Sequence, residues 1–88
     1  MKDRQTVYLI RRGRQYLQSY VAFGYETDPE KMVPIFSTYK YDAWRCMRAS
    51  TAAQVARLIK SIKHDDAPYV IDRFDKLTGD TFFVRYIH

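Results

Sequence analysis

The stretch "STAAQVARLIKSI", residues 50–62, determines the fold class because it predicts a helix with a single apolar face. Its apolar residues recur at intervals of three and four positions, which aligns them along one side of an α-helix. These residues are Ala52, Val55, Ala56, Ile59 and Ile62. The residues expected mostly on the other side are Gln54, Arg57, Lys60 and Lys63. Such a helix has to bury its apolar side against another layer, and the flanking sequence predicts a sheet.

Both ends of this helix carry signals. Thr51 is predicted to cap the amino end, and Gln54 three positions later would complete a reciprocal capping box. At the other end, the polar segment "HDDAP", residues 64–68, closes on a proline that cannot continue a helix. We therefore expect the helix to follow a cap at Thr51 and to end at this segment.

A β-hairpin is predicted on each side of the helix. Residues 5–11 and 15–23 read as strands, and Gly13 lies between them where a type I turn with a glycine bulge needs a positive φ angle. After the helix, "YVIDRFD" at residues 69–75 alternates in polarity, and "TFFVRYI" returns after a turn. That turn needs a left-handed residue at Gly79. The "RRGR" motif is thus a hairpin tip facing water.

The segment between the first hairpin and the helix is less regular. Residues 24–34 contain "DPE" at 28–30, which predicts a single helical turn that Pro34 stops. Residues 35–49 predict one or two short strands around a turn near residues 41–42.

These elements predict a single α+β domain over residues 1–88. The order is strand, strand, an optional strand, helix, strand, strand. It gives an antiparallel sheet of four to five strands with one helix packed on one face. We expect the opposite face of the sheet to be open and to carry tyrosine and arginine side chains for a partner.

Composition narrows the function. The 88 residues include 15 Lys and Arg against 10 Asp and Glu, a formal net charge of +5, which favours an anionic partner. Cys46 is the only cysteine, so an intrachain disulfide is excluded, which fits a reducing cytoplasm. The sequence has neither a secretory signal pattern nor an apolar run near the roughly 20 residues of a membrane span. We expect a soluble cytoplasmic protein without a membrane partner.

No catalytic, cofactor or metal site is predicted. His64 beside Asp65 and Asp66 could hold a metal, but a polar loop that ends the helix is the favoured interpretation. Cys46 lies near Arg45 and Arg48 and could be an activated thiol, yet a small half-buried strand residue is favoured. We therefore expect the protein not to be an enzyme.

The predicted partner-binding residues combine cations with aromatic rings. They are Arg11, Arg12, Arg14, Tyr16, Tyr20, Tyr41, Trp44, Arg45 and Arg48. Tyrosine, tryptophan and arginine are enriched in protein interfaces. The same residues would suit DNA or RNA, since a basic β-ribbon can enter a groove and aromatic rings can stack on bases. A homodimer formed through the open face is a third hypothesis.

The apolar residues near the start of the middle segment leave two alternatives open. They either form a loop that presents them to a partner or pack under the helix. They are Met32, Val33, Ile35 and Phe36.

Two passages carry a resemblance. The first is the "YLI…G…YL" pattern of residues 8–17, and the second is the strand-to-helix passage of residues 43–56 with Ala43, Trp44 and Ser50. In these the chain resembles small accessory proteins of phages and prophages of Gram-positive bacteria. It departs from them at "CMRA", residues 46–49, where a phenylalanine usually precedes the serine.

The resemblance implies a product that binds and inhibits or redirects a host protein or ribonucleoprotein, as anti-CRISPR proteins do. A net charge of +5 argues against mimicry of DNA by an acidic surface. The alternative function is that of a small basic DNA- or RNA-binding protein.

Overall fold

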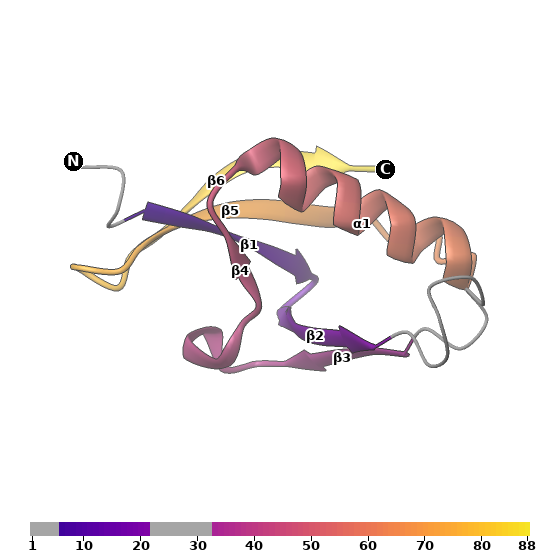
Figure 1. Ribbon diagram of the computed structural model, residues 1–88, viewed down its shortest axis with the longest axis horizontal. Helices are drawn as coiled ribbons and strands as arrows, with labels where there is room; N and C mark the ends of the chain where they lie inside the picture. Colours follow the sequence, from indigo (N-terminus) through magenta and orange to yellow (C-terminus); the bar gives the residue numbers. More distant parts are fainter. Residues whose placement is uncertain (1–5, 22–32) are drawn as a thin grey trace.

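The computed structural model describes residues 6–21 and 33–88 and has the expected α+β fold (Figure 1). One helix lies against an antiparallel sheet of six strands, one more than the expected four to five because a two-residue strand is added. The elements are β1 (Thr6–Arg12), β2 (Gln15–Val21), β3 (Val33–Ser37), the 3-10 helix η3 (Lys40–Asp42), β4 (Arg45–Cys46), α1 (Ala49–Lys63), β5 (Tyr69–Asp75) and β6 (Thr81–Ile87).

The sheet is built around β1. The strand order is β3-β2-β1-β5-β6, and β1 pairs with β5 from Thr6↔Asp75 to Arg12↔Tyr69. The other edge of β1 is shared, because β2 pairs with it only at residues 11–12 and β4 pairs at residues 8–9. The paired strands β2 and β3 therefore diverge from the rest of the sheet, as Figure 1 shows, while β6 forms the far edge.

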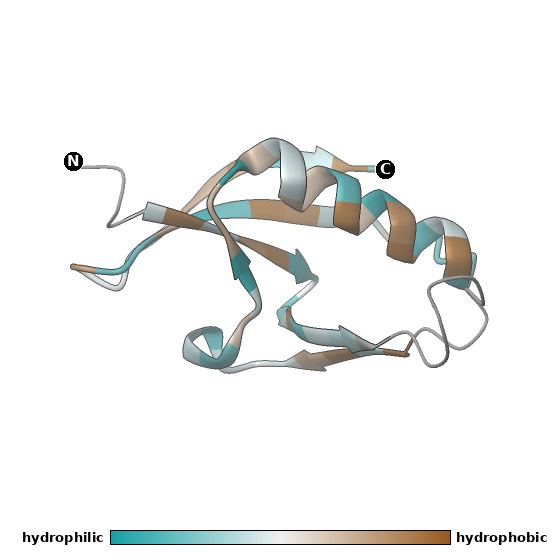
Figure 2. Cartoon of the chain, in the orientation of Figure 1, coloured by the Kyte–Doolittle hydropathy of each residue, from teal (hydrophilic) through white to brown (hydrophobic). Residues whose placement is uncertain are grey.

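The helix packs through small residues, as its sequence pattern predicts. Ala52, Ala53, Ala56 and Ile59 are buried against Ile10 and the other residues of the main core. Those other residues are Leu17, Tyr69, Ile71 and Ile87. Apolar residues accordingly concentrate in β1, in β5 and in bands along α1 (Figure 2). The alanines carry only a methyl group, so the helix can approach the sheet closely.

The predicted capping box was wrong. The helix begins at Ala49, two residues before Thr51, and Arg48 is its N-cap residue without a side-chain hydrogen bond to the first turn. The amide of Ala52 donates to the carbonyl of Arg48 at 3.2 Å, so the first turn forms directly after β4. The carboxyl end agrees with the prediction, because His64 adopts a left-handed conformation and the helix stops there.

Lys60 also differs from the expectation that it faces solvent. The residue is only 8% exposed, and its ammonium group donates to the carbonyl oxygens of Asp65, at 2.8 Å, and Ala67. It lies 5.1 Å from the centre of the Tyr69 ring. The long apolar stem is therefore buried while the charged end satisfies carbonyls of the chain reversal after the helix.

The face of β1 and β5 opposite the helix is covered, contrary to the expectation of one open face. Val7, Leu9 and Phe74 point to this side and are at most 2% exposed. Ala43, which follows η3, is buried in the same cluster, and Tyr16 of β2 is packed against it. Because β4 pairs with β1, the preceding residues are drawn across this face and bury it within the same molecule.

The other predictions concern the turns and the middle segment, and part of that segment lies outside the described residues. Both predicted turn glycines have positive φ angles, 62° at Gly13 and 80° at Gly79. The predicted turn near residues 41–42 is η3. Phe36 packs against the main core, whereas Val33 and Ile35 are each 45% exposed. The predicted helical turn at residues 28–30 and Met32 lie outside the described residues.

Candidate binding surfaces

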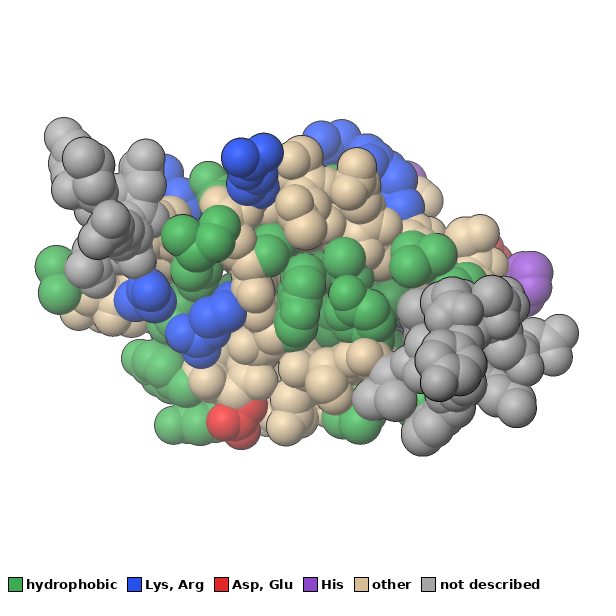
Figure 3. Space-filling model, in the orientation of Figure 1, with side chains coloured by type: hydrophobic (Ala, Val, Ile, Leu, Met, Phe, Trp, Pro, Cys, Tyr) green, Lys and Arg blue, Asp and Glu red, His purple; other side chains and the backbone are tan. Residues whose placement is uncertain are grey.

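The predicted partner-binding residues do not share one face. The reason is visible in β1, where consecutive residues of a strand point to opposite sides of the sheet. Arg11 pairs with Asp72 on the side away from the helix, and Arg12 pairs with Asp65 beside the end of the helix. On the surface shown in Figure 3, Lys and Arg side chains likewise form separate groups.

One pocket does bring several predicted residues together. It has a volume of about 390 Å³ and lies between the β1–β2 hairpin and β6. Its lining residues are Arg11, Gly13, Arg14, Tyr16, Asp72, Thr81 and Phe83. The hairpin supplies the arginines and the tyrosine, while the last two residues come from β6, the strand next to β5.

Arg11 is fixed at the wall of this pocket. Its guanidinium group contacts the Asp72 carboxylate at 2.8 Å and 3.4 Å and donates to the carbonyl of Gly13 at 2.8 Å. The side chain of Asp72 is only 4% exposed, and its hydrogen bond to Arg11 raises the pKa of that guanidinium above its usual value. The charge of Arg11 is thus largely neutralised. Arg14 is exposed, and the described residues offer it no ion-pair partner.

Exposed aromatic rings extend the pocket along β6. Phe83 and Tyr86 are 56% and 54% exposed, and their ring centres are 4.9 Å apart. The ring of His88 lies 5.6 Å beyond Tyr86. We call Arg14, Tyr16, Phe83 and Tyr86 the hairpin–β6 surface.

The β6 part of this surface was not among the residues predicted from the sequence. The available signal was the run "TFFVRYI" itself, which carries large apolar residues at neighbouring positions and so cannot bury them all on one face. A register shift between Ile71 and Asp72, the residues opposite Val84, further breaks the alternation.

The other predicted residues support the fold. The rings of Tyr20 and Trp44 contact each other edge to face, with their centres 5.7 Å apart, and both pack against the main core on the helix side. The centres of the Tyr41 and Phe74 rings are 5.7 Å apart. The Arg45 guanidinium lies 5.6 Å from the centre of the Phe74 ring and donates a hydrogen bond to the Tyr41 carbonyl. These residues thus cover Phe74. Arg48 is exposed at the start of α1.

Asp65 is the centre of a hydrogen-bonded network beside the helix end. Its carboxylate accepts two bonds from Arg12, at 2.7 Å and 3.1 Å, one from the Tyr69 hydroxyl at 2.9 Å and one from the Ala67 amide at 3.0 Å. The bonds from Arg12 hold the pKa of Asp65 well below its usual range. Burial, followed by the bond to Asp65, raises the pKa of Tyr69.

This network makes the helix-ending loop a structural feature. The oxygens of Asp65 are occupied, and the described residues form no group of three His, Cys, Asp or Glu side chains that could hold a metal. The helix ends at Lys63, so this segment is a polar loop that ends the helix, as predicted.

Replacing Asp65 with asparagine is expected to lower the free energy of unfolding at neutral pH by about 1–2 kcal/mol, since a charge-assisted pair to a partly exposed arginine is lost. The pKa of Asp65 is lower in the folded chain, so its stabilisation is present above the ordinary value of 3.8 and is lost as the pH falls below it. Denaturant unfolding at a series of pH values should show the two proteins converging under acid conditions.

The matched control is Asp66→Asn, because Asp66 is the exposed neighbour on the same loop. It should change stability little at any pH. A difference between wild type and Asp65→Asn that stays constant from neutral to strongly acidic pH would contradict the pairing. In the wild type, stability should also fall above pH 10.0, the ordinary pKa of tyrosine, because the pKa of Tyr69 is raised by folding.

Cys46 agrees with its favoured interpretation as a half-buried strand residue. It lies on β4, packs against the main core and donates its S–H to the carbonyl of Arg48 at 3.2 Å. Burial raises the pKa of its thiol. A thiol with a raised pKa forms little of the nucleophilic thiolate at neutral pH.

None of the helices in the described parts of the chain has the length and apolar character needed to cross a membrane. Comparisons with models of protein families, with curated proteins and with solved structures gave no match. The candidate surfaces therefore have to be interpreted from their own geometry and chemistry.

Proposed function

We propose that this protein is a non-enzymatic interaction module of the phage accessory type that binds, and thereby inhibits or redirects, a host protein or ribonucleoprotein in the bacterial cytoplasm. The observation that carries the proposal is the hairpin–β6 surface. Two aromatic rings more than half exposed lie beside a pocket whose Arg14 has no ion-pair partner among the described residues. The central strands of this sheet are buried on both faces. Exposed aromatic rings and arginines on a rigid scaffold are typical of residues that dominate binding energy.

The distribution of charge favours a protein target over free nucleic acid. Phosphate binding depends on cations that are free to replace counterions. Arg11 and Arg12 are already paired with Asp72 and Asp65, so the hairpin tip presents less free charge than its sequence suggests.

Direct binding of single-stranded DNA or RNA is the second candidate. The observation in its favour is the exposed pair of rings at Phe83 and Tyr86, which could stack on bases while Arg14 contacts a phosphate. Titration of fluorescent single-stranded DNA and RNA at low and at high salt separates the two. A direct nucleic-acid binder loses affinity steeply with salt, whereas the proposed module should bind free nucleic acid weakly at both concentrations.

A photo-crosslinking amino acid placed at position 83 is expected to capture a specific protein from a lysate of the bacterial host, because Phe83 lies at the centre of the proposed interface. The matched control is the same amino acid at Leu58, which is 46% exposed on α1 and remote from the hairpin. Crosslinked products would be compared by mass spectrometry. The second readout is the Arg14→Glu variant, which should remove most of the product at position 83.

Equal products from positions 83 and 58, or a product at 83 that Arg14→Glu leaves unchanged, would contradict the proposal.

A further inference from the structure

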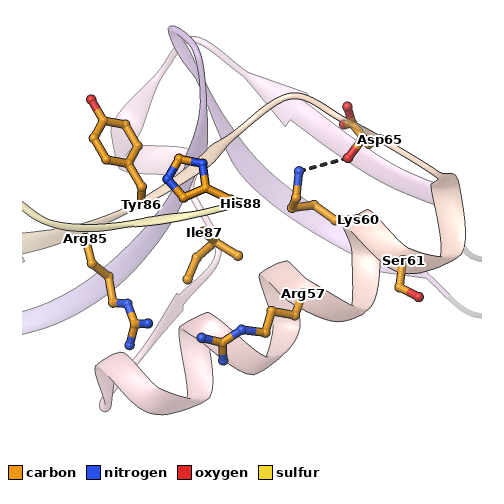
Figure 4. A pocket seen from close by; sticks show the side chains of 8 residues that line it. All are labelled: Arg57, Lys60, Ser61, Asp65, Arg85, Tyr86, Ile87 and His88. Carbon is orange, nitrogen blue, oxygen red and sulfur yellow. Dashed lines mark hydrogen bonds between the residues drawn. The ribbon is translucent and has the colours of Figure 1, made fainter.

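A second concave surface lies on the helix side of β6. It is a groove of about 490 Å³ between α1 and the carboxyl-terminal end of β6. Arg57, Lys60 and Ser61 line it from the helix, and residues 85–88 line it from the strand side (Figure 4). Figure 4 shows the Arg57 and Arg85 side chains reaching the same side of the groove from the two elements. We call this the α1–β6 groove.

The strand that borders this groove has a free edge. β6 pairs only with β5, and no described strand lies on its other side. In an edge strand, alternate residues turn an N–H and a C=O group outward without a partner. The side chains along this strand are also apolar and exposed, with Phe82 at 45% and Val84 at 37%. The edge therefore offers both main-chain and apolar contacts to an extended chain.

The arginines of the groove are free of ion pairs with described residues, whereas Arg11 and Arg12 of the hairpin are paired. Arg57 and Arg85 are exposed, and neither forms an ion pair with another described residue. Among the described residues that line the groove, Asp65 alone has a carboxylate side chain, and Arg12 and Tyr69 already occupy it. Two arginines thus remain available at the side of the free strand edge.

We propose that the α1–β6 groove binds an extended acidic segment of a partner protein as an added strand. Its backbone pairs with the free edge of β6, and its carboxylates meet Arg57 and Arg85. Addition of a strand to an exposed sheet edge is a general mode of peptide recognition, in which main-chain bonds supply affinity and side-chain contacts supply specificity. Charge-assisted bonds from arginine to carboxylate are the strong polar contacts available here.

Charge distinguishes this occupant from a second copy of the same chain. Residues 81–87 contain Arg85 but no acidic residue, so pairing two β6 strands would bring cationic edges together. An acidic segment avoids this repulsion, because its carboxylates would meet the arginines.

This inference does not rest on the proposed function, because the groove and the hairpin pocket share no lining residue, although Tyr86 borders the groove and also belongs to the hairpin–β6 surface. The test is selection of binders from a displayed library of random ten-residue peptides against the intact protein. Selected peptides are expected to be enriched in Asp and Glu and to contain few prolines, since proline removes a main-chain donor. In titrations of isotope-labelled protein with a selected peptide, the largest amide shifts should fall on β6.

Arg85→Glu should weaken binding of the selected peptides by roughly tenfold or more, the scale of one lost charge-assisted contact. Arg57→Glu should weaken peptide binding by a similar factor. Because Arg57 lies on α1, this variant still tests the proposal if Arg85→Glu misfolds the strand. Arg48→Glu is the matched control, since Arg48 is an exposed arginine at the other end of α1, and it should have little effect.

The proposal is overturned if no peptide is selected, if selected peptides lack acidic residues, or if both glutamate variants bind as tightly as wild type. A dimer seen by light scattering and disrupted by a proline at position 83 would overturn it in favour of a second copy. Crosslinking at position 83 reports on the hairpin–β6 surface, so it can fail while the groove still binds peptide.

Discussion

Replacing Arg11 with methionine should lower the free energy of unfolding by about 3 kcal/mol, because it leaves the Asp72 carboxylate buried without its partner. The side chain of Asp72 is 4% exposed and that of Arg11 is 29% exposed, so water could reach the vacated position only partly. We therefore expect the lower end of the cost of breaking a buried pair. Urea unfolding followed by tryptophan fluorescence measures this change through Trp44.

Two further variants separate loss of the pair from loss of an arginine. Arg14→Met removes the exposed arginine three residues away and should change stability by no more than about 0.5 kcal/mol. The double variant Arg11→Met with Asp72→Leu removes both charges and should recover to within about 1 kcal/mol of wild type, since a buried pair can often be replaced by apolar groups at little cost. If the double variant were as unstable as Arg11→Met alone, the packing of the arginine stem rather than the pairing would be responsible.

The local structure of this protein could be predicted from local patterns. The apolar stripe of residues 50–62 identified α1, and alternation with turn glycines identified both hairpins. The predicted start of the helix was wrong, because the path of the chain before the helix decides where it begins. β4 pairs with β1 and fixes that path, so the helix begins at Ala49 although Thr51 has a high propensity for a cap. Lys60 was misplaced because a helix stripe does not show that the chain folds back to bring Asp65 and Ala67 over that turn.

The candidate site was predictable only in part. Arg11 and Arg12 could have been assigned to opposite faces from strand alternation alone. Their partners Asp72 and Asp65 are 61 and 53 positions away, so no local pattern identifies those pairs. The pocket that joins Arg14 and Tyr16 to Phe83 depends on the strand order, which places β5 between β1 and β6.

The prediction of an open face opposite the helix was wrong, because it depended on a strand pairing that no local pattern shows. A lone helix covers one side of a sheet, but β4 has only two residues and carries no recognisable strand pattern. Its pairing with β1 brings Ala43 and the aromatic residues before it onto the other side. The far face of β6 remains exposed, and the hairpin–β6 surface lies there.

Phe74→Ala is expected to destabilise the protein by about 3–5 kcal/mol, the usual cost of removing a fully buried phenylalanine. Phe74 is 1% exposed and forms the centre of the second core cluster with Val7 and Leu9. For 88 residues, typical domain stabilities correspond to roughly 4–13 kcal/mol, so the variant would lose a large fraction of the total. The Tyr41 ring and the Arg45 guanidinium would lose the surface on which they rest.

A local readout distinguishes this from general destabilisation. The amide of Trp44 donates to the carbonyl of Leu17 at 2.7 Å, a bond that ties the covering segment to β2. In Phe74→Ala, hydrogen exchange at Trp44 should accelerate more than exchange at Ile59 in the helix, because the covering segment loses its support first. Phe82→Ala is the matched control: Phe82 is 45% exposed on the adjacent strand, and its loss should cost less than about 1 kcal/mol. Equal costs for the two phenylalanines would mean that the second cluster is not buried, and the face opposite the helix would again be open to a partner.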